Sequence, residues 1–381
     1  MKVNRTEQIV LRLLRAAVFG SSVQYTEDTD WNAVFEEMSI HRVAGIPCDL
    51  LGTLPLDEAT RRKWQSYCVN QQIFYQKIAT AQTELCTAFK ETGIDFAVIK
   101  GMSAAVYYPI PAYRTMGDID MLIREADVPK AEKLLWGLSY NRIRGINDRH
   151  RNYRKNGIEL ELHTRFARMK DESREKMLNA YLMNSMENVT GMLPVSQNGM
   201  VILQHLRQHL PEGIGLRQVM DWMMFVHASG LTDWTEFNEI SQQTGAFTFQ
   251  KTLTKLCVKY LGLPARGDIA WCDDADEELC DELMQFVFSK GNFGYKTGAT
   301  DNSGKIATSG NIFGAFARLQ RGGLCRWEAA RKHPVLRPFA WAYELTLYAK
   351  GLNSNGTFLQ SLARNITSVH SHKSLLKDLG I

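Results

Sequence analysis

The sequence predicts an α+β fold in which a small mixed β-sheet is flanked along the chain by helical regions. Two patterns carry this prediction. Residues 1 to about 90, and most residues after 163, place apolar side chains at the three- and four-residue spacing of helices. Residues 91 to 170 instead contain short segments with the period-two alternation of strands. With 381 residues, 45% of them apolar and 23% charged, the chain can bury a sizeable core in two or three domains.

The N-terminal region, residues 1–90, is predicted to be a helical cap. Apolar spacing predicts a helix over residues 9–18 that ends at Gly20, because glycine readily adopts the left-handed conformation that follows a helix. The same spacing continues over residues 31–38 and 58–89, and glycine and proline turns separate these segments.

The central region, residues 91–170, is predicted to hold the sheet. A strand over residues 95–99 ends at Lys100-Gly101, a short helix follows over 103–108, and a second strand covers 118–123. A helix starts near Asp127. The Lys155-Asn156-Gly157 segment is typical of a tight hairpin turn, whose second arm carries two glutamates.

The remaining chain is predicted to form three regions. Residues 171–290 form a helical domain, residues 291–312 form a flexible loop rich in Gly, Ser, Thr and Asn, and residues 313–381 form a basic, aromatic helical region with a tail. Within residues 171–290, the predicted helices cover 198–210, 216–228, 234–243, 247–261 and 277–289.

Composition narrows the class of protein. The net charge of +4 is too small to indicate nucleic-acid binding by itself. The seven cysteines form no C-x-x-C pair, so we expect buried or free thiols in a reducing compartment. No signal peptide or membrane span is recognisable, and we therefore expect a cytoplasmic protein without a membrane partner.

Paired carboxylates are the main functional signal. In Asp118-Ile119-Asp120, strand periodicity projects both carboxylates from one face, roughly 6.5 Å apart, which allows them to share a divalent cation. A third carboxylate from a neighbouring strand, Glu159 or Glu161, would complete a metal clamp of the kind used in phosphoryl and nucleotidyl transfer. The alternative for Asp-x-Asp alone is a solvated turn or cap.

These residues resemble the DNA polymerase beta-like nucleotidyltransferase superfamily, and more closely the family called uncharacterised nucleotidyltransferases. The shared pattern is a Lys-Gly after a strand, then Arg-x-Met-Gly-Asp-Ile-Asp, then an acidic strand ending in Leu-His; here it comprises Lys100-Gly101, residues 114–120 and Glu161-Leu162-His163. The resemblance spans roughly residues 5–265, includes residues 215–222 preceded by His205, and favours Glu161 as the third carboxylate.

The resemblance implies transfer of a nucleoside monophosphate from a nucleoside triphosphate to a hydroxyl or similar acceptor, with release of pyrophosphate. It implies Mg²⁺ or Mn²⁺ as cofactor: Asp118, Asp120 and Glu161 would hold one metal, the two aspartates would hold the other, and Glu161 is a candidate general base. The acceptor would be a small molecule or a protein. The usual Gly-Gly or Gly-Ser loop is replaced by Gly101-Met102-Ser103, so base preference does not carry over.

Further residues are candidates for supporting roles. The candidates for binding the nucleotide are Lys100, Gly101, Ser103, Arg114 and Gly117. For Lys100 and Arg114 the alternative is a surface ion pair. The candidates for the surroundings of the site are Glu159, His163, Arg217 and Asp221. A structural hydrogen bond is the default for His163, and an i,i+4 ion pair is the default for Arg217 and Asp221. The alternative is that Arg217 and Asp221 line the far wall of the cleft, where a nucleobase or acceptor would bind.

Other functions compete with this interpretation. Residues 142–155 hold six basic side chains against one aspartate, which suits either a polyanionic substrate or a charged, solvated hairpin. A low-turnover regulatory or antitoxin-like binding protein on the same fold is one alternative function. RNA binding by residues 313–350 is another, but we do not favour it because their aromatic residues also fit a helical core.

Overall fold

A six-stranded mixed sheet lies at the centre of the protein, as the α+β prediction requires. The computed structural model describes residues 3–143, 150–297 and 374–381, with scattered positions between 320 and 346. The strands run in the order β3-β4-β5-β2-β1-β6. Strand β1 pairs antiparallel with β2 and parallel with β6, whereas β2 pairs parallel with β5. Their bounds are β1 Phe96–Ile99, β2 Ile119–Ile123, β3 Asn141–Ile143, β4 His150–Lys155, β5 Ile158–His163 and β6 Thr190–Met192.

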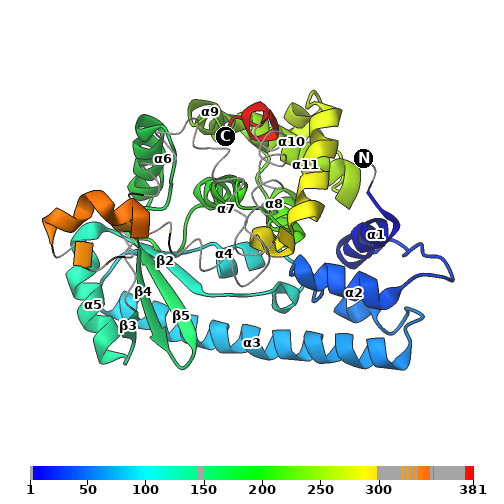
Figure 1. Cartoon of the computed structure of the whole chain (residues 1–381), viewed down its shortest axis with the longest axis horizontal. Coiled ribbons are helices and arrows are strands. Elements are labelled where there is room, and N and C mark those ends of the chain that lie inside the picture. Colours follow the sequence, from blue (N-terminus) through cyan, green and yellow to red (C-terminus); the bar gives the residue numbers. More distant parts are fainter. Residues whose placement is uncertain are drawn as a thin grey trace.

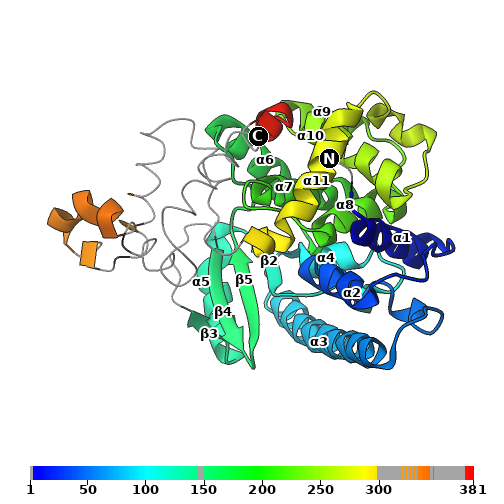
Figure 2. The same cartoon turned by 45° about the vertical axis from the view of Figure 1, so that its right-hand side comes forward.

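Helices cover both faces of this sheet (Figure 1). The helix α3 extends along one side of the molecule from the sheet to α2, as Figure 2 also shows. The helices before the hairpin are α1 Arg5–Phe19, α2 Trp31–Ile40, α3 Glu58–Glu91, α4 Gly101–Ala105 and α5 Val128–Gly137. Those after it are α6 Glu172–Asn184, α7 Val195–His209, α8 Leu216–Ala228, α9 Thr235–Gln243, α10 Phe247–Leu256 and α11 Glu277–Lys290.

Strand alternation divides the apolar side chains between two cores. Phe96 and Val98 of β1 pack with α3 and α5, whereas Ala97 and Ile99 pack with the helices on the other face. In β2 and β5, Met121 and the other apolar residues at alternate positions pack with α3 and α5. Asp120 and Glu161, which occupy the intervening positions, therefore project toward the layer that contains α7 and α8.

The two cores cross the predicted segment boundaries. Helices α1 and α2 contribute to the core that contains α7, α8, α10 and α11, whereas α3 contributes to both cores, with Trp64 in the first and Phe89 in the core beneath the sheet. The C-terminal residues 374–381 return to α7, because Arg207 Nη2 donates a hydrogen bond to the carbonyl oxygen of Gly380 at 2.8 Å. The boundaries at residues 90, 170 and 290 stay predictions.

Local signals explain several element ends. The Asn4 side chain accepts a hydrogen bond from the Glu7 amide at 3.0 Å at the start of α1, and Gly20 with φ of 69° ends that helix. Asn156 and Gly157 have φ values of 51° and 80°, as a two-residue hairpin turn requires.

Other sequence predictions were wrong in detail. The short strand β6 was not predicted. The predicted helix over 247–261 was confirmed over its whole length, as α10 followed by a π-helical turn, Cys257–Leu261. Part of the predicted loop, Asn292–Thr297, forms 3-10 turns. Residues 298–312 of that loop, and most of the predicted basic region at 313–350, lie outside the described residues.

The prediction that every cysteine is a thiol was also wrong, because Cys48 and Cys68 form a disulfide. Packing of α3 against the turn at Cys48–Leu50 brings their Cα atoms to 6.1 Å, although 20 positions separate them in sequence. Four described cysteines are thiols, namely Cys86, Cys257, Cys272 and Cys280, and Cys325 lies outside the described residues. Within the described ranges, every helix is too short or too polar to cross a membrane.

Candidate active site

Three carboxylates lie close together on the neighbouring strands β2 and β5 and on the residue before β2, beside the end of β1. Asp118 lies directly before β2, Asp120 is the second residue of β2, and Glu161 lies opposite Asp120 across the parallel β2 and β5 pair. One oxygen from each carboxylate lies within 4.8 Å of the others. Asp120 is 3% exposed, so this cluster lies largely between the sheet and the helices on that face.

Lys100 and His163 contact this cluster. Lys100 Nζ lies 2.6 Å from Asp120 Oδ1 and 3.4 Å from Glu161 Oε2. His163 Nε2 lies 2.8 Å from the same Asp120 oxygen and 3.3 Å from Glu161 Oε2. Because the lysine is cationic, it offsets part of the repulsion between the two acidic groups.

The backbone at Lys100 explains how its side chain reaches this position. Lys100 follows the last residue of β1 and has φ of 55°, a positive value that is uncommon outside glycine. The following residue, Gly101, packs closely: a Cβ there would lie 3.3 Å from Met116 Cε and 3.5 Å from the Asp118 carbonyl oxygen. This close approach holds the end of β1 against the segment that enters β2.

The carboxylates differ in their electrostatic environments. Burial and the neighbouring Asp120 charge raise the pKa of Asp118 to about 6. Burial would also raise the pKa of Glu161, but hydrogen bonding to His163 and the charge of Lys100 outweigh it and hold that pKa well below its ordinary value. Glu161 therefore remains ionised at neutral pH, which suits a metal ligand better than a general base.

The donor set of this cluster fits a hard divalent cation. Mg²⁺ and Mn²⁺ prefer carboxylate oxygens, and the close approach of three carboxylates is unfavourable unless a cation balances it. Burial raises the pKa of Asp118, and repulsion from Asp120 and Glu161 adds to this rise. Asp118, Asp120 and Glu161 are therefore the residues that would hold such a cation.

The structure separates the two glutamates that the sequence left as alternatives. Glu161 lies beside the aspartates, whereas Glu159 forms an ion pair with Arg154, its cross-strand neighbour on β4. The other described basic residues of this hairpin also form ion pairs: Arg142 and Arg151 with Glu132, and Lys155 with Glu84. This arrangement favours a charged, solvated hairpin. Arg144 and Arg149 lie outside the described residues.

Arg114 and Asp221 form a buried bidentate pair, so the predicted i,i+4 pair between Arg217 and Asp221 was wrong. Arg114 Nε and Nη2 donate to the two Asp221 carboxylate oxygens, each at 2.7 Å, and Tyr108 also donates to Asp221, at 2.8 Å. Burial disfavours the Arg114 charge, but Asp221 more than compensates and raises its pKa. Arg114 is 3% exposed, and this pair ties the loop before β2 to α8.

Ser103 and Gly117, the two remaining predicted nucleotide contacts, differ from each other in burial. The Ser103 hydroxyl is buried and donates to the Lys100 carbonyl oxygen at 3.1 Å. Gly117 is exposed, and a Cβ there would meet no atom within 4 Å. The nucleotide-binding roles of Ser103 and Gly117 stay predictions.

A wall of basic and aromatic residues from the helices lies near the carboxylates. His205 and His209 of α7 have ring centroids 4.8 Å apart, and Phe293 lies 5.0 Å from His209. Arg217 of α8 lies over the Phe293 ring at 5.7 Å. Arg217 Nη1 donates to the Thr115 carbonyl oxygen at 3.4 Å, so this wall contacts the segment that leads into Asp118.

Sequence reasoning missed several of these residues. His150 and Asn152 of β4 lie 3.5 Å and 3.4 Å from Glu161 Oε1, and His150, Glu161 and His163 also form a second group with ligand atoms within 4.8 Å of one another. Antiparallel pairing of β4 with β5 places them there, and the hairpin turn at residues 155–157 could have revealed that register. No sequence signal indicated Phe293.

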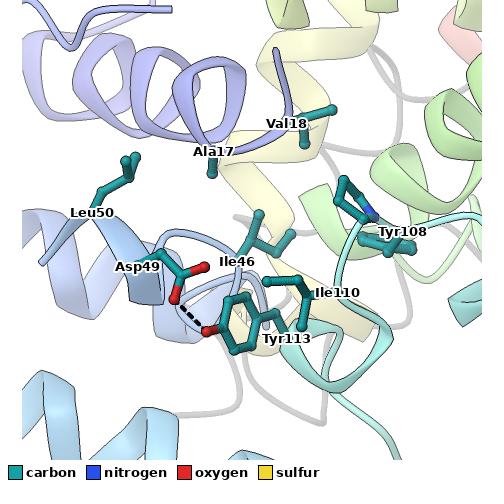
Figure 3. Close-up of a pocket in the computed structure, with 9 residues that line it drawn as sticks. Ala17, Val18, Ile46, Asp49, Leu50, Tyr108, Ile110 and Tyr113 are labelled. Carbon is teal, nitrogen blue, oxygen red and sulfur yellow. Dashed lines mark hydrogen bonds between the residues drawn. The ribbon is translucent and has the colours of Figure 1, made fainter. Parts of the chain in front are cut away.

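A separate pocket lies between α1 and the loop after α4 (Figure 3). Its wall is mostly apolar and includes Ala17, Ile46, Leu50 and Ile110. Tyr113, also in this wall, donates a hydrogen bond to Asp49. The residues that line it include none of the clustered carboxylates.

Comparison with known families agrees with the geometry of the carboxylate cluster. A family model described as uncharacterised nucleotidyltransferase matches residues 27–262, which is more than half of the chain. The chain belongs to this nucleotidyltransferase family. The match contains the whole carboxylate cluster, the Arg114–Asp221 pair and the histidines of α7. Searches of curated proteins and of solved structures found no match.

Proposed function

We propose that this nucleotidyltransferase uses Mg²⁺ or Mn²⁺ to move a nucleoside monophosphate from a nucleoside triphosphate to a hydroxyl or similar group. The acceptor would belong to a small molecule or a protein. The observation that carries the proposal is the convergence of Asp118, Asp120 and Glu161, with ligand oxygens within 4.8 Å of one another. Family membership independently supports nucleotidyl transfer as the type of reaction.

The reaction is a displacement at phosphorus. The acceptor oxygen forms a bond to the α-phosphorus, the bond from that phosphorus to the bridging oxygen of the β-phosphate breaks, and pyrophosphate leaves. The acceptor proton passes to water. A cation held by Asp118, Asp120 and Glu161 would stabilise charge on the transferred phosphoryl group and lower the pKa of the acceptor hydroxyl.

The neighbouring residues keep the carboxylates ready for this role. His163 contacts both Asp120 and Glu161, which fixes the direction of the two side chains. The Lys100 ammonium contacts the same two carboxylates and offsets part of their charge. Asp118, Asp120 and Glu161 would hold the cation, which would add positive charge beside the substrate phosphates.

The test is transfer of α-³²P label from each of the four ribonucleoside triphosphates, with Mg²⁺ or Mn²⁺. The acceptors are the protein itself and a desalted, RNase-treated cell extract. Asp118→Asn and Asp120→Asn are compared with Asp274→Asn, which changes an exposed aspartate that pairs with Lys251. We expect label transfer by the native protein and by Asp274→Asn, and none by the other two variants.

Two results would contradict this proposal. One is label transfer that persists in both Asp118→Asn and Asp120→Asn. The other is no transfer by the native protein together with no metal or nucleotide binding that depends on these carboxylates. In that case a binding function would be the better explanation.

A further inference from the structure

Arg217 is a half-buried cation that lacks a carboxylate partner within the part of the chain that the structure describes. Its Nη1 donates to the Thr115 carbonyl oxygen at 3.4 Å, a long hydrogen bond, and its Nε is buried without an acceptor. The nearest acidic residue on its own helix, Asp221, is instead engaged by Arg114 and Tyr108. A buried N–H of a guanidinium that has no acceptor is unfavourable, and a bound anion would supply the missing acceptor and the counter-charge.

The surroundings of Arg217 leave it cationic and place a neutral histidine in the same group of residues. Burial and the charge of Arg114 lower the pKa of Arg217 to about 10, which still leaves it cationic at neutral pH. Burial, the neighbouring His209 and the charge of Lys100 hold the pKa of His205 well below its ordinary value, so this histidine is neutral. Neutral His205 adds no charge, but each of its ring nitrogens can accept or donate a hydrogen bond according to the tautomer.

The backbone of Arg217 is held firmly at the start of α8. The buried ring of His41 accepts a hydrogen bond from the Leu216 amide at 3.2 Å, and the Arg217 amide donates to the His41 carbonyl oxygen at 3.3 Å. Glu37 lies 3.1 Å from the other nitrogen of that ring. The side chain of Arg217 also packs over the Phe293 ring, with its Cζ atom 5.7 Å from the ring centroid. The position of Arg217 is therefore set by the fold.

The other expected phosphate contacts are already engaged. Arg114 donates to both oxygens of Asp221, the Ser103 hydroxyl donates to a backbone carbonyl, and Lys100 contacts Asp120 and Glu161. Among these groups, Arg217 alone retains a buried donor with no acceptor, and its contact with Thr115 places it beside the segment that leads into Asp118.

We propose that Arg217 binds the polyphosphate of the nucleoside triphosphate, with His205 and His209 beside it, in place of the glycine-serine loop that this chain has altered. This inference rests on the proposed function and names the group that orients its substrate. The Arg217 contact with Thr115 would place a phosphate bound by α8 beside the segment that carries Asp118. Arg217 is then a substrate-binding residue, and Arg114 is a positioning residue that holds Asp221 away from it.

The test is isothermal titration calorimetry with inorganic tripolyphosphate, first in EDTA and then with Mg²⁺. We expect Arg217→Gln to weaken tripolyphosphate binding about tenfold or more in both conditions, because charge-assisted hydrogen bonds to phosphate are lost. Arg217→Lys keeps the charge without the planar fork, so it should weaken binding less. Arg62→Gln, which changes an exposed arginine paired with Glu58, is the control and should bind as the native protein does.

Thermal unfolding of each variant shows whether it is folded, and Arg217→Lys provides the comparison if Arg217→Gln is not. Equal tripolyphosphate affinity of the native protein and the folded variants would overturn the inference. So would absence of tripolyphosphate binding by the native protein in both conditions. An increase in KM for the acceptor with unchanged KM for the nucleotide would instead assign Arg217 to an anionic acceptor.

The label-transfer assay separates this inference from the proposed function. Label transfer by the native protein with an unaltered nucleotide KM in Arg217→Gln would leave the proposed function standing and overturn the role of Arg217. Loss of tripolyphosphate binding in Arg217→Gln, combined with no label transfer by the native protein, would support the phosphate site and count against the transferase.

Discussion

Replacing Asp118 by asparagine should stabilise the metal-free protein while removing its metal site. Asp118 is partly buried and lies within 4.8 Å of two further carboxylates. Burial and Asp120 raise its pKa from an ordinary 3.8 to about 6. The folded state therefore disfavours the ionised form, and an uncharged side chain of the same shape relieves that cost.

The pKa of Asp118 sets both the size and the sign of this effect. A rise in the Asp118 pKa from 3.8 to about 6 lowers the free energy of unfolding at pH 7.5 by at most about 3 kcal/mol. Between pH 4 and 6 the folded state binds more protons than the unfolded state, so this contribution lowers stability as pH rises and is constant above pH 6. The native protein should thus lose stability relative to Asp118→Asn across that window.

Urea denaturation in EDTA at several pH values measures this difference. We expect Asp118→Asn to be about 1–3 kcal/mol more stable than the native protein at pH 7.5 and equal to it near pH 4. Addition of Mg²⁺ should stabilise the native protein and leave the variant unchanged, because only the native protein binds the cation. Equal stability at pH 7.5 would refute the reasoning, as would equal stabilisation of both proteins by Mg²⁺.

Two further predictions follow from the contacts around this site. Glu161→Gln should abolish Mn²⁺ binding measured by electron paramagnetic resonance, whereas Glu159→Gln should leave it unchanged, because Glu159 pairs with Arg154 instead; loss in both variants would contradict the assignment. Asp221→Asn should lower the free energy of unfolding by about 3–5 kcal/mol, because it leaves the buried Arg114 charge without its partner. Urea denaturation checks this second prediction, with Asp274→Asn as control, and a change below about 1 kcal/mol would contradict it.

The elements that could be predicted well from the sequence are those that depend on interactions between residues close together in the chain. The Asn156-Gly157 turn, the end of α1 at Gly20 and the alternation of β2 depend on residues close together in the chain, and each has its expected form in the structure. Strand β6 was missed because three residues, one of them a glycine, carry too little pattern.

Contacts between distant residues were the ones that sequence could not predict. An i,i+4 pair between Arg217 and Asp221 was a reasonable expectation, but such a pair contributes only about 0.2–0.5 kcal/mol. Arg114, 107 positions away, offers a buried bidentate contact instead. Similarly, Glu159 and Glu161 share a strand face, and only the register with β2 and β4 shows that Glu161 lies beside Asp120. The catalytic and nucleotide-binding roles of these residues stay predictions.

The most direct test of the central claim is a crystal structure with Mn²⁺ and a nucleoside triphosphate analogue whose bridge between the α- and β-phosphates is a methylene group. We predict an anomalous peak for Mn²⁺ bound by Asp118, Asp120 and Glu161, with the α-phosphate of the analogue beside it. A structure with the analogue bound elsewhere, no Mn²⁺ at the three carboxylates and Lys100 still between Asp120 and Glu161 would contradict the claim.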